Sequence, residues 1–150
     1  MITFEDDGFA LDTYLIHDNC VNRLLKEWDE YGKLIVAYDF DNTVNDSVGG
    51  TTGYSGQVRE LVRACKEMGC TMIVFTCRTA EEYPLVKKYL NDNDIPYDYI
   101  NENIPDLSIK TSNKIFFNIL LDDRCGLSAS YEILVDVLRK RKAIIDSEGR

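Results

Sequence analysis

Short apolar runs alternate with amphipathic segments along most of this chain. Four runs predict β-strands, namely Leu34–Tyr38, Met72–Phe75, Tyr97–Ile100 and Ile119–Leu121. Three of them are nearly continuous, which is typical of strands buried on both faces of a parallel sheet. The run Tyr97–Ile100 is the weakest of the four, because Asp98 interrupts it.

Helical periodicity lies between these runs. Apolar residues at i, i+3, i+4 and i+7 mark one face of a helix from Val58 to Met68, and Gly69 is its natural stop. Thr79 and Glu82 predict a capping box for a helix that reaches about Asn91. Two further helices are marked by Val21, Leu24, Leu25 and Trp28, ending near Gly32, and by Tyr131, Leu134, Val135 and Leu138.

This alternation predicts the α/β class, as a three-layer α/β/α, Rossmann-like parallel sheet. The chain has 150 residues and 45% apolar content, which suggests one globular domain over residues 1–150. We expect residues 1–32 to form an N-terminal helical extension and residues 33–142 to form the core.

Charge and cysteine content restrict the partners and the compartment. The net charge of −9 disfavours long nucleic acids and anionic membranes. No apolar run approaches the roughly 18–20 residues of a membrane span, and the acidic start lacks the features of a signal peptide. The five cysteines form no CxxC pair, so free thiols in a cytoplasmic protein are expected. The sequence does not indicate an oligomeric state.

Polar residues follow every predicted strand. They are Asp39 and Asp41, then Thr76 and Arg78, then Asn101 and Asn103, and finally Asp122, Asp123 and Arg124. The carboxyl ends of parallel strands meet at one edge of a sheet, so these side chains should converge. Close carboxylates repel one another unless a cation lies among them, and Mg²⁺ is the natural choice for oxygen ligands. There is no His/Cys cluster for zinc, and His17, the single histidine, is expected at the surface or in a cap.

Three of these segments resemble the motifs of the haloacid dehalogenase superfamily. They are "DFDNT" (residues 39–43), "MIVFT" ending at Thr76, and "ILLDD" ending at Asp122 and Asp123. The resemblance spans about residues 33–140 and is closer to small, nearly capless members found in bacteria and phages. Those members have segments similar to "TCR", "NENIP", "SNKI" and "LLDDR" here. "SNKI" favours Lys114 as the third-motif lysine, with Lys110 as the alternative.

The resemblance implies a Mg²⁺-dependent phosphomonoester hydrolase. Asp39 would be the nucleophile that forms an aspartyl-phosphate, and Asp41 the general acid and then the general base. Thr76 and Lys114 would bind phosphoryl oxygens.

The metal set implied by the resemblance is Asp39, the backbone carbonyl of Asp41, Asp122 and Asp123. Asn42 and Arg78 are further candidates for substrate binding. Arg78 and Arg124 have an alternative role as counter-charges to Asp122 and Asp123. Asn101 and Asn103 are expected either at the rim of the site or in turns.

Two features depart from many members of the superfamily. Asn42 stands where many have glycine, although asparagine tolerates left-handed backbone geometry. Only about a dozen residues follow the first motif before the next helix, so no cap domain fits and the site should be open. The segment Gly49–Gly56 predicts a flap over it, in which Tyr54 could touch a leaving group.

The substrate is expected to be a small phosphoester such as a nucleotide. Alternatives are polynucleotide ends, a phosphoprotein, or a catalytically silent binding protein with the same fold. A phosphorylated receiver module is disfavoured. In a receiver the acid pair precedes the lysine along the chain, whereas here Asp122 and Asp123 follow it. The basic run Arg139–Lys142 is expected at a helix C-terminus, where it would compensate the helix dipole.

Overall fold

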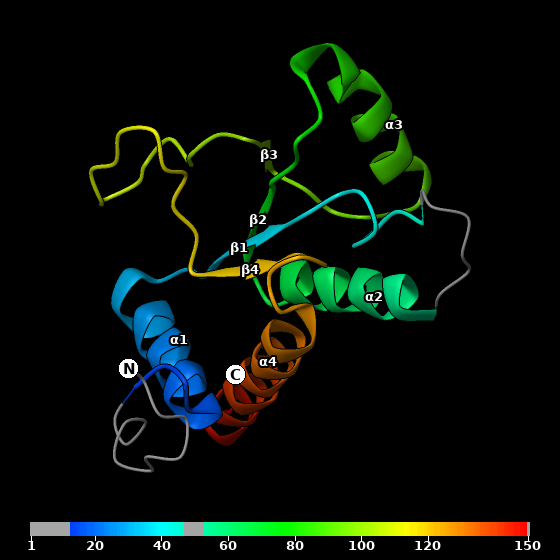
Figure 1. Ribbon diagram of the computed structural model, residues 1–150. Coiled ribbons are helices and arrows are strands. Elements are labelled where there is room, and N and C mark those ends of the chain that lie inside the picture. Colours follow the sequence, from blue (N-terminus) through cyan, green and yellow to red (C-terminus); the bar gives the residue numbers. More distant parts are fainter. Residues whose placement is uncertain (1–12, 47–52, 150) are drawn as a thin grey trace, which may run out of the picture.

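The computed structural model describes residues 13–46 and 53–149 (Figure 1). The helices are α1 (His17–Tyr31), α2 (Gly53–Glu67), α3 (Tyr83–Asp92) and α4 (Leu127–Ser147), with a 3-10 turn, η2 (Ala80–Glu82), before α3. The strands are β1 (Ile35–Tyr38), β2 (Thr71–Val74), β3 (Tyr99–Ile100) and β4 (Ile119–Leu121). Residues 49–52 of the predicted flap and the side chain of Tyr54 lie outside the described residues, while residues 53–56 begin α2.

The four strands form one parallel sheet in the order β3-β2-β1-β4. This confirms the predicted α/β class and the parallel, Rossmann-like sheet. β1 is a central strand whose four residues are all buried, as its continuous apolar run predicts. β3 has only two residues, because Asp98 uses its carboxylate to accept from the Met72 N–H at 2.8 Å and to pair with Lys66.

Alternate residues of the strands enter two separate cores. Val36, Tyr38 and their neighbours pack with buried side chains from all four helices. Ile35, Ala37 and Ile73 form a smaller core on the opposite face, under residues 101–118, which connect β3 to β4. Figure 1 shows this connection on one side of the sheet, with α2 and α3 on the other. The third layer of the fold is therefore an irregular segment, where the alternation predicts a helical layer.

The helix ends follow their local chemistry. Gly32 adopts φ 72° and donates its N–H to the Trp28 carbonyl at 2.9 Å, which ends α1 where glycine predicts. The capping box of Thr79 and Glu82 is present, with the Thr79 N–H 2.9 Å from Glu82 Oε2.

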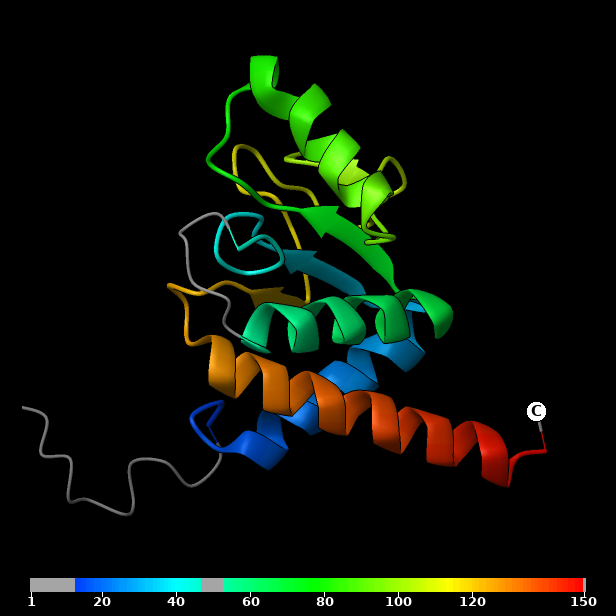
Figure 2. The same cartoon turned by 90° about the vertical axis from the view of Figure 1, so that its right-hand side faces the viewer.

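The expected position of the basic run Arg139–Lys142 is wrong. α4 continues to Ser147, so the run lies inside the helix and not at its C-terminus. Arg141 instead pairs with Asp29, and its guanidinium carbon lies 4.8 Å from the centroid of the Trp28 ring. Both contacts join α4 to α1. Figure 2 shows α4 as a long helix beside α2.

Three smaller features complete the description. His17 Nε2 lies 2.7 Å from Asp136 Oδ2, a second link between α1 and α4. All five cysteines are free, as predicted. Within the parts of the chain that the structure describes, no helix is both long and apolar enough to cross a membrane.

Candidate active site

The residues that directly follow the four strands form a row along the carboxyl edge of the sheet. The strand register extends past each strand end, because Asp39 donates its N–H to the Leu121 carbonyl and Phe75 donates to Tyr38, both at 2.9 Å. Asn101 donates to Val74 in the same way, at 2.8 Å. The row therefore runs Asp122, Asp39, Phe75, Asn101, which brings residues from four separate segments to one edge of the sheet.

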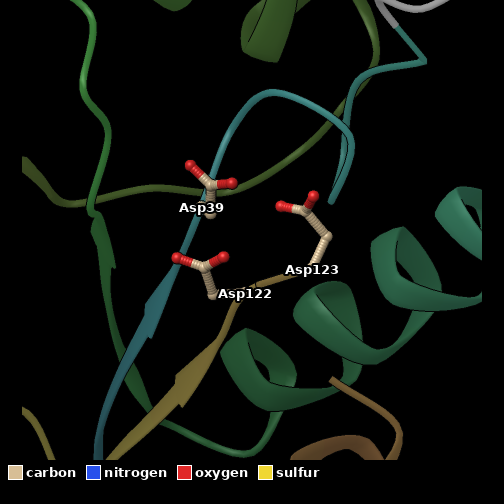
Figure 3. A group of neighbouring side chains, drawn as sticks. All are labelled: Asp39, Asp122 and Asp123. Carbon is tan, nitrogen blue, oxygen red and sulfur yellow. The ribbon is translucent and has the colours of Figure 1, made fainter. Parts of the chain in front are cut away.

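Three carboxylates meet at the middle of this edge. Asp39, Asp122 and Asp123 each place one carboxylate oxygen within 4.8 Å of the other two (Figure 3). Asp39 follows the central strand, while Asp122 and Asp123 follow its neighbour β4. Carboxylate oxygens at this spacing suit a hard divalent cation, so this group could hold a metal ion such as Mg²⁺.

The raised pKa of Asp39 is consistent with a metal site at these three carboxylates. The pKa of Asp39 is raised from 3.8 to about 7, chiefly by burial and then by the hydrogen bond with Asp123 and the charge of Asp122. Without a cation, the site therefore favours a proton on Asp39. A divalent ion would offset the same repulsion and keep Asp39 ionised at neutral pH.

The hydroxyl of Thr43 joins two of these carboxylates. Thr43 is fully buried, and its Oγ1 accepts the Asp123 N–H at 3.1 Å. The same oxygen lies 3.3 Å from Asp123 Oδ1 and 3.4 Å from Asp39 Oδ2. Its single proton serves one of these carboxylates at a time. Thr43 was not among the predicted site residues, although it ends the "DFDNT" motif.

The carboxylate of Asp41 lies outside this group and is held by Arg78. Arg78 Nε donates to Asp41 Oδ2 at 2.9 Å, and Nη2 donates to Oδ1 at 2.7 Å. Arg78 also contacts Glu82 at 3.3 Å, and its guanidinium lies 5.7 Å from the Phe40 ring centroid. These hydrogen bonds, chiefly that with Asp41, raise the pKa of Arg78. The suggested pairing of Arg78 with Asp122 or Asp123 is thus wrong, because Asp41 accepts from it.

The turn that follows the two motif aspartates has the expected geometry. Asn42 adopts φ 62°, the left-handed conformation that asparagine tolerates. Its backbone N–H donates to the Asn45 carbonyl at 2.8 Å, so this N–H is satisfied within the turn.

Asn101 fixes the backbone of Thr76. Its Oδ1 accepts the Thr76 N–H at 2.8 Å, and its Nδ2 donates to the Thr76 carbonyl at 2.7 Å. The same Nδ2 donates to the Tyr83 hydroxyl at 2.8 Å. Thr76 is buried, and its Oγ1 accepts the Arg78 N–H at 3.1 Å. Thr76 is thereby linked to the Arg78–Asp41 pair.

The two candidate lysines lie on the exposed connection between β3 and β4. Neither Lys114 nor Lys110 forms a hydrogen bond or an ion pair with any described residue, so the choice between them stays a prediction. Asn103 stabilises this connection, because its Oδ1 accepts the Phe116 N–H at 2.7 Å and its Nδ2 donates to Thr111 at 3.0 Å.

Arg124 approaches the site through its backbone. Its N–H donates to Asp122 Oδ1 at 2.8 Å, while its side chain forms no ion pair with the described residues. The suggested pairing of its guanidinium with Asp122 or Asp123 is therefore absent there.

Comparisons with known proteins support the fold. No protein-family model matches the chain, and no curated protein matches it. Among solved structures, a conserved protein from Bacteroides thetaiotaomicron is similar, with a TM-score of 0.55 at 16% identity. The match covers 69% of this chain and 91% of that protein. At this identity the likeness shows the fold alone: an α/β protein with a parallel sheet, here carrying an aspartate cluster at the carboxyl edge.

Proposed function

We propose that this protein is a Mg²⁺-dependent phosphomonoester hydrolase of the haloacid dehalogenase type. The observation that carries the proposal is the position of Asp39, which ends the central strand within 4.8 Å of Asp122 and Asp123. The motif order in the sequence agrees with it, since the nucleophile, the hydroxyl, the lysine and the acid pair follow one another as in that superfamily.

Asp39 acts as the nucleophile. Its carboxylate attacks phosphorus, the bond from phosphorus to the ester oxygen breaks, and an aspartyl-phosphate forms on Asp39. Asp39, the Asp41 backbone carbonyl, Asp122 and Asp123 would hold Mg²⁺, which would supply positive charge against the phosphate dianion. Thr43 keeps Asp39 and Asp123 in place through its buried hydroxyl.

Asp41 transfers the protons. It protonates the departing ester oxygen and then accepts a proton from the water that cleaves the aspartyl-phosphate. Arg78 holds both oxygens of Asp41 and so sets the direction in which this carboxylate points.

Thr76 and Lys114 bind the phosphoryl oxygens. The Asn101 clamp fixes the Thr76 backbone at the end of β2. Lys114, without an acidic partner among the described residues, has its charge available for a phosphate. Arg78 and the side chain of Asn42 are secondary substrate contacts in this scheme.

The substrate is a small phosphoester. The net charge of −9 opposes the approach of a long polyanion, whereas a single phosphate can be bound by Lys114 and Mg²⁺.

A phosphoester panel with and without Mg²⁺ tests the proposal. It includes nucleotides, sugar phosphates, phosphopeptides and oligonucleotides phosphorylated at the 3′ or 5′ end. We expect release of phosphate from small esters, abolished by EDTA and reduced at least about 10³-fold in Asp39→Asn. Asp106→Asn, a surface carboxylate paired with Lys33 at 2.7 Å, is the matched control and should keep full activity.

Two results would contradict the proposal. Equal activity of Asp39→Asn and the wild type would exclude an aspartyl-phosphate on this residue. Activity confined to phosphorylated oligonucleotides would retain the chemistry and overturn the small-molecule substrate.

A further inference from the structure

Phe75 is an exposed aromatic residue beside the proposed nucleophile. It follows β2 directly, and the register that pairs Tyr38 with Val74 makes Phe75 the neighbour of Asp39 in the next strand. Adjacent strands lie about 5 Å apart. Phe75 belongs to neither hydrophobic core, and it is 37% exposed.

Phe75 and Asp39 also share a face of the sheet. Ile35 and Ala37 of β1, and Ile73 of β2, point to the face covered by the connection between β3 and β4. Alternation along each strand places Asp39 and Phe75 on that same face. Phe75 confirms this placement, because its ring meets the ring of Phe117 from the connection, with centroids 5.7 Å apart and planes tilted by 54°.

A cavity in the connection between β3 and β4 adjoins Phe117. It has a volume of about 300 Å³ and is lined by Ile109, Thr111, Lys114, Ile115, Phe116 and Phe117. Its walls are mainly apolar and aromatic, and Lys114 brings a positive charge to them. The Thr111 hydroxyl accepts from Asn103 and retains its own proton for a ligand acceptor.

We propose that Phe75, Phe117 and this cavity bind the aromatic leaving group of the substrate, which makes the substrate class a nucleoside monophosphate. The inference rests on the proposed function and deepens it. A volume near 300 Å³ lies at the lower end of the range for ligand pockets and suits a single base. A base has a flat π-face for Phe75 and Phe117, and Phe75 is the strand neighbour of Asp39, which would attack the phosphate. Sugar phosphates offer no such face.

Steady-state kinetics with paired substrates tests this subsite. With Mg²⁺, we expect kcat/KM for AMP and UMP to exceed that for ribose 5-phosphate about tenfold or more, since base stacking contributes on this scale. Phe75→Leu and Phe117→Leu keep apolar volume and remove the ring, so each should reduce kcat/KM for the nucleotides about tenfold more than kcat/KM for ribose 5-phosphate. Tyr31→Leu, an aromatic residue 45% exposed at the end of α1, is the control and should change neither.

Binding of the nucleoside alone separates the two proposals. Adenosine should bind the wild type in ligand-observed NMR, and ribose should not; Phe75→Leu should lose the adenosine signal. Equal kcat/KM for nucleotide and ribose 5-phosphate, unchanged in both leucine variants, would overturn the subsite while the phosphatase stands. If no ester is hydrolysed, the proposed function fails, and adenosine binding alone then tests the subsite. A signal that is present in the wild type and lost in Phe75→Leu supports the subsite. Absence of the signal in the wild type excludes it.

Discussion

At the scale of single residues, one buried hydroxyl organises the acidic cluster. Thr43 contacts Asp39, the Asp123 carboxylate and the Asp123 backbone, and it is fully buried. A buried polar group costs stability unless it is hydrogen-bonded, so this position requires a small side chain with both a donor and an acceptor.

Replacing Thr43 by valine keeps the shape and removes those bonds. We expect the free energy of unfolding to fall by about 1–2 kcal/mol, because the Asp123 N–H loses its acceptor and the carboxylate that accepts the Thr43 proton loses its donor. Mg²⁺ affinity should fall about 10- to 100-fold, as for other residues that orient metal ligands. Urea unfolding and calorimetric titration measure the two effects. Thr71→Val, at the amino end of β2, is the control; an equal loss of Mg²⁺ affinity there would contradict the role of Thr43.

Asp39 makes the stability of the metal-free protein depend on pH. Its pKa is raised from 3.8 to about 7 in the folded state, so between about pH 4 and pH 7 the native protein binds more protons than the unfolded chain. Stability should therefore fall as pH rises through this window. In EDTA at pH 8, Asp39→Asn should be more stable than the wild type by about 1–3 kcal/mol.

Chemical unfolding of both proteins at pH 5 and pH 8 measures this difference. Asp106→Asn provides the control, because Lys33 lowers the pKa of Asp106 and its titration lies below the window. If Asp39→Asn has the same pH dependence as the wild type, Asp39 is not the group that titrates.

At the scale of elements, short strands are continued by side chains. β2 ends at Val74, yet Asn101 bonds to both the N–H and the carbonyl of Thr76, as a further strand residue would. Asn101 adopts φ 52°, which turns the chain away from β3 while its side chain stays on Thr76. The side-chain amide of Asn101 thus holds together the segments that follow β2 and β3.

Substitutions at Asn101 separate these two effects. Asn101→Gly keeps the left-handed backbone and loses the clamp, so about 1–2 kcal/mol of stability should be lost. Asn101→Ala adds the cost of a positive φ and should lose about 1 kcal/mol more. Denaturant unfolding measures both variants, with Asn93→Ala, an exposed residue after α3, as the control. Equal stability of the alanine and glycine variants would contradict the strain argument.

The predictions for elements were correct where one strong local pattern decided them, and wrong where a distant partner did. β4 has the predicted bounds, and Gly32, Gly69 and the Thr79 capping box mark real helix ends. α4 extends past the basic run, where Lys142 pairs with Asp146 one turn later at 2.8 Å, and the partners of Arg141 lie on α1, which sequence periodicity does not reveal.

At the scale of the whole molecule, the sheet is covered unequally. Among the described residues, the helices cover one face, and the connection 101–118 covers the other with Ile104 and the segment 115–117. The site lies at the edge where the two layers meet, and it combines a cluster of negative charge with a net charge of −9. A cation at this edge should stabilise the entire fold, because it binds the native arrangement of the three aspartates.

Thermal unfolding with Mg²⁺ and with EDTA tests that linkage. Saturating Mg²⁺ at pH 8 should raise Tm by about 5 °C or more. The increase should shrink toward pH 5.5, because protons compete with the metal for Asp39. Asp122→Asn should abolish it, and Asp106→Asn should preserve it. An equal Tm increase at both pH values, or in Asp122→Asn, would place the stabilising cation elsewhere.

The sequence by itself determined the α/β class, the strand that carries Asp39 and Asp41, and the edge to which the polar residues belong. Hydrophobic periodicity and strand-end chemistry are local, so they can be read without coordinates. Only the tertiary structure decided the partners. It placed Asp39 with Asp122 and Asp123, paired Asp41 with Arg78, bound Asn101 to Thr76, and set Phe75 beside Asp39. These contacts join residues more than 20 positions apart, and their geometry follows from strand register and crossover direction.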